Sequence, residues 1–263
     1  MRQREMKSPD SDAMVFNEVV DNELNFVNTA KLMEITGRSY PDLKTVLSRL
    51  VRNEQLFPIE KGLYAVRNFR NPYVIGNAMV TEGAIAYWSA LNLHGLTEQI
   101  PNVVYVQSAK PKNDRKVFNV RYRFIQVKKD KICGIIQMGY GNERFRITGI
   151  EKTLLDCFDL PQYSGGYEEL IRAFYRAKIN SRKLLDYGKQ MGNLSVLKRL
   201  ALLSELFEMK GFINFQNEVL KIRNQRYTLL DPMESNEGVF NAKWRIRMNI
   251  EKDKLLEIIN KMY

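Results

Sequence analysis

Acidic side chains that could hold a metal ion occur in two short patterns. Asp10 and Asp12 form an Asp-x-Asp pair, which nucleotidyltransferases use to hold two metal ions, but no Gly-Ser helix start precedes it. Asp156 and Asp159 lie three residues apart, and Glu151 lies about one helical turn before them, so a metal ion could bridge their carboxylates. Their neighbours are apolar: Leu154, Leu155, Cys157 and Phe158. This pattern favours the polar positions of a packed helix over a metal site.

Other reactive groups are sparse. Glu151-Lys152 lacks the residue that separates the glutamate from the lysine in restriction-type nucleases. Ser164-Gly165-Gly166 could bind an anion through backbone amides at a helix N-terminus, although such glycine turns commonly only begin a helix. His94 is the one histidine, and with Cys133 and Cys157 it falls short of a four-ligand zinc site. The sequence therefore predicts no catalytic residues, no metal site and no cofactor.

The composition is that of an ordinary globular protein. Of the 263 residues, 44% are apolar and 27% are charged, and the net charge is +11. No apolar run approaches the roughly 20 residues of a membrane helix, and MRQREMKSPDSD at the start has no apolar stretch after its charges. We therefore expect a soluble, cytoplasmic protein without a membrane partner.

The positive charge lies outside the first 70 residues. Residues 1–70 contain 11 Lys or Arg and 10 Asp or Glu, which leaves a net +10 for residues 71–263. Residues 110–131 alone hold nine basic and two acidic residues, and a second basic stretch runs over 172–199. These stretches predict a basic surface for a polyanion or an acidic partner, although a solvated face is the commoner explanation. The residues assigned to it are Lys112, Arg115, Lys116, Arg121, Arg123, Lys128, Lys129, Arg172, Arg176, Arg182, Lys183, Lys198 and Arg199.

Hydrophobic spacing and start signals divide the first 70 residues into short elements. They predict a helix at 12–22, a brief strand at 26–27, a second helix from Thr29 to a Gly37 stop, a third helix from Ser39, and a hairpin over 56–66. This order is typical of a winged helix-turn-helix. The alternative is a small three-helix domain used for protein contacts.

The third helix carries one continuous apolar stripe and one polar face. The stripe consists of Leu43, Val46, Leu47, Leu50 and Val51. In a winged helix-turn-helix, such a stripe packs on the first two helices while the polar face enters the major groove and the hairpin reaches the DNA backbone. The predicted DNA-binding residues are Arg38, Ser39, Tyr40, Lys44, Thr45, Ser48, Arg49 and Arg52, together with Lys61 at the hairpin tip.

The polar segment 68–73 predicts the boundary to a second domain. That domain, 71–263, divides into a sheet-containing core at 71–160 and a helical tail with two late strands at 161–263. We expect a helix over 81–96, strands near 103–107, 118–125, 132–138 and 144–148, helices at 151–158, 168–178, 181–191 and 194–208, a further short helix, strands near 227–230 and 239–248, and a final helix. The fold class predicted is α+β: a winged helix-turn-helix, then a mixed α/β domain with a small sheet and a helical C-terminal part.

Three segments of the second domain resemble one known family. They are AYWSALNLHGLTEQIPNVVYV (86–106), RITGIEKTLLDCFDLPQYSGGYEELIRAF (146–174) and SVLKRLALLSELF (195–207). The combination of WSAL-x-x-HGL-x-x-Q-x-P, I-x-x-x-EKT-x-x-D and P-x-x-x-GG resembles the AbiEi antitoxins of type IV toxin-antitoxin and abortive-infection systems, which act in phage defence. The resemblance implies a non-catalytic, two-domain repressor that binds repeats of double-stranded DNA in its own promoter and counteracts a nucleotidyltransferase-like toxin. It does not imply which surface neutralises the toxin, or whether the toxin is bound directly.

Two other functions stay open from the residues themselves. One is a DNA-targeted nuclease, which needs convergent carboxylates that the sequence does not show. The other is a ligand-sensing transcriptional regulator without a toxin partner. A nucleotidyltransferase gene beside this one would favour the antitoxin over both.

Overall fold

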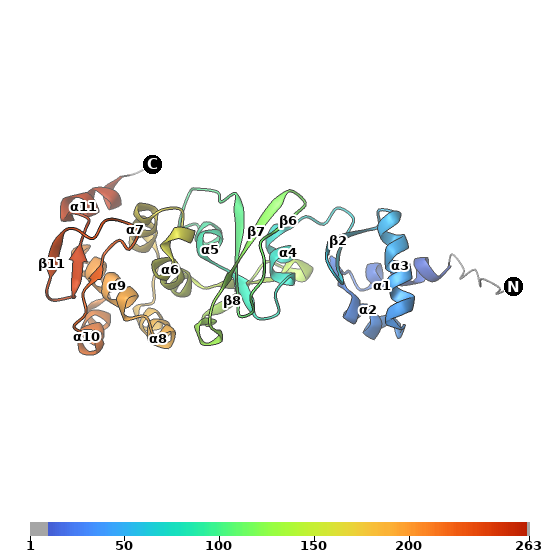
Figure 1. Cartoon of the computed structure of the whole chain (residues 1–263), viewed down its shortest axis with the longest axis horizontal. Coiled ribbons are helices and arrows are strands. Elements are labelled where there is room, and N and C mark those ends of the chain that lie inside the picture. Colours follow the sequence, from blue (N-terminus) through green and yellow to red (C-terminus); the bar gives the residue numbers. More distant parts are fainter. Residues whose placement is uncertain (1–9, 262–263) are drawn as a thin grey trace. The chain divides into compact units, whose positions relative to one another are not determined.

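The computed structural model describes residues 10–261 of the chain, a mixture of helices and strands (Figure 1). The first nine residues, which hold most of the N-terminal segment MRQREMKSPDSD, lie outside the described residues. The contacts divide the chain into two compact units. Unit 1 runs to Met79 and also contains Met138–Phe145, and unit 2 comprises Val80–Gln137 and the chain from Arg146 onward.

Unit 1 contains four helices and three strands in its described part. In chain order these are α1 (Asp10–Asp21), β1 (Phe26–Asn28), α2 (Thr29–Thr36), α3 (Tyr40–Arg52), β2 (Leu56–Glu60), β3 (Leu63–Val66) and α4 (Pro72–Ala78), and the loop at Met138–Phe145 adds one 3-10 turn, Gly141–Glu143. The strands form an antiparallel sheet of order β1-β3-β2, so that β3 lies in the middle. The predicted order of elements in this region is confirmed by the structure.

The helices of unit 1 begin and end where their residues favour it. Asn28 caps α2 by accepting a hydrogen bond from the Ala30 amide at 2.8 Å, and Gly37 ends α2 with a left-handed φ of 63°. Ser39 caps α3, and Pro41 in its first turn fits a position that needs no amide donor. The core buries apolar residues from all three helices and the sheet: Val15, Val19, Val27, Leu32, Leu43, Val46, Leu47, Leu50 and Leu56.

The boundary of unit 1 differs from the one expected at residue 70. Helix α4 belongs to unit 1, where Tyr73 stacks against Phe145 with ring centroids 5.6 Å apart. The Asn142 side chain donates to the backbone oxygen of Glu23 at 2.7 Å, and Asn25 donates to the Asn142 backbone oxygen at 3.2 Å. Segment 68–73, predicted from its polarity to be the domain boundary, instead contains the start of a helix, because Asn71 caps α4 and Pro72 fits its first turn.

Unit 2 contains a six-stranded mixed sheet of order β6-β7-β5-β4-β9-β8. Its strands are β4 (Gly83–Ile85), β5 (Val103–Ser108), β6 (Arg115–Val117), β7 (Val120–Gln126), β8 (Ile135–Met138) and β9 (Phe145–Thr148). Pairs β5·β7 and β4·β9 are parallel, whereas β4·β5 and β6·β7 are antiparallel. The prediction of a sheet in this part of the chain is confirmed.

Helices α5 (Tyr87–Leu93) and α6 (Ile150–Asp159) lie beside this sheet in Figure 1. The remaining elements are α7 (Tyr167–Arg176), α8 (Ser181–Met191), α9 (Leu194–Leu206), α10 (Ile213–Ile222), β10 (Thr228–Leu229), β11 (Val239–Asn241), β12 (Ile246–Met248) and α11 (Lys252–Asn260), with 3-10 turns at Lys129–Lys131 and Pro161–Tyr163. Strands β10, β12 and β11 form a second small sheet, with β12 in the middle. One apolar cluster joins α5 to α11 and this sheet through residues such as Phe158, Phe174, Leu200 and Trp244.

One predicted helix is wrong in its first turn. Residues 83–85 form strand β4 rather than the start of a helix over 81–96. A Cβ atom on Gly83 would lie 2.0 Å from the backbone oxygen of Gln107, so this glycine allows β5 to approach. The apolar run Ala84-Ile85-Ala86 fits a short buried strand as well as a helix, and sheet pairing decides between them.

Candidate nucleic-acid interface

Helix α3 separates a buried apolar side from an exposed polar side. Leu43 and Leu50 are fully buried. On the other side, Lys44, Ser48 and Arg52 are exposed. The remaining exposed residues predicted for this face are Ser39, Tyr40 and Thr45. The face therefore offers cations and short hydrogen-bonding groups on a rigid element.

The small polar residues of α3 are partly engaged within the helix. Ser39 Oγ donates to Asp42 Oδ2 at 2.7 Å, which holds the one acidic residue of α3 at the helix start. Thr45 Oγ1 donates to the Pro41 backbone oxygen at 3.3 Å, and Ser48 Oγ donates to that of Lys44 at 2.8 Å. These hydroxyls remain exposed and keep acceptor capacity for a ligand.

Two arginines predicted to bind DNA contact side chains of α1. Arg49 makes a bidentate ion pair with Asp12, with Nε 2.5 Å from Oδ2 and Nη2 2.6 Å from Oδ1. This hydrogen bonding raises the pKa of the Arg49 guanidinium. Arg38 Nη1 donates to Ser11 Oγ at 2.6 Å. Both side chains are half-buried, and they tie the first helix to α3 and to the turn before it.

Lys61 lies at the tip of the β2–β3 hairpin, as predicted, and is exposed. The turn is tight because Gly62 adopts a left-handed φ of 77°. The Gly62 backbone oxygen accepts hydrogen bonds from the Thr29 amide at 2.8 Å and from Thr29 Oγ1 at 3.2 Å. The hairpin tip is therefore fixed to the first residue of α2, and Lys61 extends from a rigid base.

The first basic stretch of unit 2 forms an exposed edge of the large sheet. Lys116 on β6 pairs directly with Arg121 on β7, which places two cations side by side. Arg123 lies on the same face, where its Nε contacts Asp114 Oδ2 at 3.1 Å. The other predicted members here are Arg115, Lys128 and Lys129, which are exposed, and Lys112, which lies 5.3 Å from the Phe124 ring. Lys129 pairs with Glu82 at 3.1 Å.

The second basic stretch does not form the predicted surface. Arg176, Arg182 and Lys183 are exposed, but three of its residues are buried: Arg172, Lys198 and Arg199. Helices α7 and α9 pack on several sides, so these charged groups point into the protein and bind partners there. The prediction that they contribute to a basic surface is wrong.

Each buried cation has a distinct set of partners. Arg172 forms an ion pair with Glu169 at 2.5 Å, and Arg199 donates to the backbone oxygen of Leu229 at 2.9 Å. Lys198 Nζ donates to the backbone oxygen of Arg226 at 2.7 Å. Burial and the neighbouring arginines lower the pKa of Lys198 to about 8.

Two of the carboxylates considered for metal binding, Asp156 and Asp159, are bound to lysines, whereas Asp12 is bound to Arg49 and Glu151 accepts from the Asn180 amide. Asp156 is buried and hydrogen-bonded to Lys152 one helical turn away, and burial raises its pKa to about 6. Asp159 contacts Lys131 Nζ at 2.8 Å and accepts from Asn193 at 2.5 Å. Among residues 11–261, no group of three or more His, Cys, Asp or Glu side chains could hold a metal ion.

The histidine and the two cysteines occupy structural positions. His94 ends α5, and its Nε2 lies 2.7 Å from the Thr148 backbone oxygen. Burial lowers the pKa of His94 and raises the pKa of the thiols of Cys133 and Cys157. These directions favour neutral side chains, which suits packing rather than nucleophilic chemistry.

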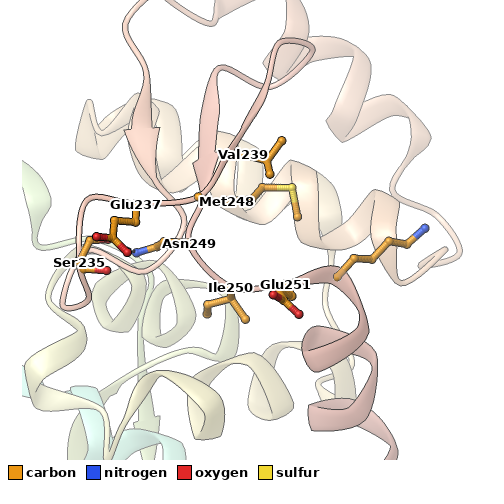
Figure 2. Close-up of a pocket in the computed structure, with 9 residues that line it drawn as sticks. Ser235, Glu237, Val239, Met248, Asn249, Ile250 and Glu251 are labelled. Carbon is orange, nitrogen blue, oxygen red and sulfur yellow. Dashed lines mark hydrogen bonds between the residues drawn. The ribbon is translucent and has the colours of Figure 1, made fainter.

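A hollow of about 490 Å³ lies between β11, the end of β12 and the start of α11 (Figure 2). Val239 and Met248 line one side and Ile250 another, and Glu237 and Glu251 lie at the edge. Ser235, Asn249 and Lys252 add further polar groups to its lining. The hollow therefore offers apolar contacts beside charged and hydrogen-bonding groups.

No helix in the described part of the chain combines the length and apolar character that crossing a membrane requires. No protein-family model and no curated protein matches the sequence. Among solved structures, the chain is similar to the crystal structure of the RV2827C protein from Mycobacterium tuberculosis, with 15% identity and a TM-score of 0.61. The likeness covers 97% of this chain and 96% of that chain, and it concerns the fold.

Proposed function

We propose that this protein is a DNA-binding transcriptional autorepressor and the antitoxin of a type IV toxin-antitoxin system. In this proposal unit 1 is a winged helix-turn-helix, α3 is its recognition helix, and the β2–β3 hairpin is its wing. The observation that carries the DNA-binding part is the exposed side of α3, where Lys44 and Arg52 stand on a helix whose opposite side is fully packed.

The geometry of α3 suits a helix that lies in the major groove. Lys44 and Arg52 are eight residues apart, which corresponds to about 12 Å along the helix axis. Ser48 lies between them, within reach of the same groove, and Tyr40 extends from the N-terminal end. The proposed contacts are base edges for Lys44 and Ser48 and phosphates for Arg52 and Tyr40. Arg38 and Arg49 act by holding α1 in place.

The antitoxin part of the proposal depends on the family resemblance of unit 2. The partner would be a nucleotidyltransferase-like toxin, and unit 2 would contribute without catalysis. The engagement of Asp156 with Lys152, and of Asp159 with Lys131, supports a structural rather than a catalytic role for these carboxylates. The exposed cations on β6 and β7 supply a charged surface for DNA or for an acidic partner.

A mobility-shift assay with the protein's own promoter tests the DNA-binding part. Replacing Lys44 or Arg52 by alanine should weaken specific binding by about 1 to 3 kcal/mol. The control is Lys210→Ala, because Lys210 is also exposed and lies in unit 2. Unchanged binding after combined replacement of Lys44, Ser48 and Arg52 would refute the assignment of α3.

Co-expression with the product of a neighbouring nucleotidyltransferase-like gene tests the antitoxin part. The full chain should restore growth in cells that produce the toxin, and the triple α3 variant should still do so if DNA binding and neutralisation are separate. Metal-dependent cleavage by the purified protein, abolished by Asp156→Asn or Asp159→Asn, would instead support a nuclease.

A further inference from the structure

Two adjacent aromatic rings lie between two arginines on one face of the small sheet in unit 2. Phe240 on β11 lies directly opposite Arg247 on β12, so the two side chains share a face. The Arg247 guanidinium carbon is 5.1 Å from the centre of the Phe240 ring. The Tyr227 ring lies edge-on to Phe240 with centroids 4.9 Å apart, and the Arg245 guanidinium carbon is 5.4 Å from the centre of the Tyr227 ring. The result is a continuous row, Arg247–Phe240–Tyr227–Arg245, which we call the Arg-aromatic row.

The side chains that this region packs into the apolar core of unit 2 are not those of the Arg-aromatic row. Ile246 and Trp244 are fully buried and belong to the main apolar cluster. Phe240, in contrast, is 57% exposed. An aromatic side chain that is more than half exposed offers apolar ring area to a ligand.

The surroundings of the Arg-aromatic row hold more basic than acidic residues. Residues 221–248 contain six Lys or Arg and three Asp or Glu. Lys221 and Lys243 pair with Glu218 and Glu205. Arg245 donates to the Tyr227 hydroxyl at 3.0 Å, and Arg247 donates to Asn236 Oδ1 at 2.9 Å, so both bind uncharged acceptors here. Within residues 11–261, the buried Nε atoms of Arg223 and Arg245 have no hydrogen-bond partner. These contacts with uncharged acceptors leave the charges of Arg245 and Arg247 unneutralised, which fits an anionic ligand.

The backbone also fixes the row. Arg245 adopts a left-handed φ of 54°, which is uncommon for a residue other than glycine. Its backbone oxygen accepts from the Thr228 amide at 3.2 Å and from Lys198 Nζ at 3.4 Å. The buried lysine therefore helps to hold Arg245 where its side chain covers Tyr227.

We propose that the Arg-aromatic row binds single-stranded nucleic acid, with an unpaired base stacked on Phe240 and phosphates on Arg245, Arg247 and the exposed Arg226. Ring area flanked by arginines can stack a base and bind the phosphates on either side of it, which is how proteins hold a single strand. Paired bases in a duplex would not expose a face to Phe240, and an acidic protein would need the charges but not the ring. The single strand, rather than either of these, is the ligand that uses both features.

Fluorescence anisotropy of the full chain with labelled oligonucleotides of about 12 nucleotides tests the proposal. Oligo(U), oligo(dT) and a duplex of the same length serve as probes, and the first two distinguish RNA from DNA as the source of the strand. Phe240→Leu, which keeps apolar area but removes the ring, should weaken binding of the preferred single strand by about 5- to 150-fold. Phe240→Trp should bind at least as tightly as the original.

Val239→Ala is the matched control, because Val239 is 76% exposed on the same strand but lines the hollow of Figure 2 rather than the Arg-aromatic row. It should leave single-strand binding unchanged. Duplex binding should be insensitive to Phe240→Leu and sensitive to the α3 replacements, so this proposal and the proposed promoter binding can fail independently. Equal single-strand binding by the original and Phe240→Leu, or no single-strand binding at about 50 mM salt, would overturn the proposal. Displacement of the strand by polyglutamate with no dependence on Phe240 would show a general acidic-partner surface instead.

Discussion

Arg49 of α3 and Asp12 of α1 form a bidentate ion pair across 37 positions of sequence. Both side chains are partly shielded from solvent, with exposed fractions of 32% and 18%. This pair connects the first helix of unit 1 to the helix that we propose reads DNA. It therefore couples the stability of the unit to the position of α3.

Asp12→Ala and Arg49→Ala should each lower the free energy of unfolding by about 1 kcal/mol, and the double variant should lose little more than either single one. Arg49→Lys should not restore stability, because lysine cannot make the bidentate contact. Urea unfolding monitored by circular dichroism measures these values. If Arg49 also contacted DNA, Arg49→Ala would weaken promoter binding more than Asp12→Ala does, whereas the structure predicts equal effects.

Lys61→Ala should lower DNA affinity about equally for the promoter and for random sequence. Lys61 is exposed at a rigid hairpin tip, so it supplies a phosphate contact without base information. The slope of log affinity against log salt should become shallower by about 0.9. Titrations at several salt concentrations with both DNAs give these slopes. A changed sequence preference in this variant would contradict the backbone contact.

Lys152→Met should destabilise unit 2 by about 3 to 5 kcal/mol, because Asp156 would stay buried without its positive partner. Replacing both residues, Lys152→Met with Asp156→Leu, should be less destabilising than Lys152→Met alone. Chemical denaturation of the original protein, of Lys152→Met, of Asp156→Leu and of the double variant tests this order. If the losses of the two single variants simply added, the pair would not be acting as a buried unit.

The stability of the protein should rise with pH through the titration of Lys198. The pKa of Lys198 is lowered from 10.5 to about 8 in the folded protein, first by burial and then by the charges of Arg199 and Arg223. Between these two values the unfolded chain binds more protons than the folded one, so the free energy of unfolding increases with pH. Below pH 8 both states carry the charge, and this contribution is constant.

The comparison of the original protein with Lys198→Met isolates this effect from other titrating groups. The difference in unfolding free energy between the two should shift in favour of the original by about 1 kcal/mol from neutral pH to about pH 9.5. Urea unfolding at each pH gives the difference. If the unfolding free energies of the two proteins changed with pH by the same amount, the lowered pKa of Lys198 would be contradicted.

The sequence predicted the elements of unit 1 because their signals are local. The α3 stripe, the Ser39 cap and the Gly62 turn each act within a few residues, and the structure has a helix and a hairpin at those places. The ion pair of Arg49 with Asp12 was not predictable from such local signals, because Asp12 belongs to another helix. Pairing between distant side chains depends on packing that periodicity does not describe.

The burial of Lys198 and Arg199 has a signal in the sequence of α9. Helix α9 is apolar on nearly every side: Val196, Leu197, Leu200, Ala201, Leu202 and Leu203 are all buried. A helix without a polar face is enclosed by the protein, so its cations must find internal partners. Charge counted along the sequence cannot distinguish such residues from exposed ones, and this is why the predicted basic surface included them.

Segment Met138–Phe145 belongs to unit 1 although the chain on both sides of it belongs to unit 2. The polypeptide therefore crosses between the units at three peptide bonds rather than one: after Met79, after Gln137 and after Phe145. A gene fusion that transplants only the chain up to Met79 would leave behind Asn142 and Phe145, with their contacts to Glu23 and Tyr73. A protease that cuts once after Met79 would likewise leave that segment attached to the other fragment. Unit 1 therefore cannot be exchanged between proteins by joining the chains at a single position. A change of its binding specificity is better made by substitutions on α3.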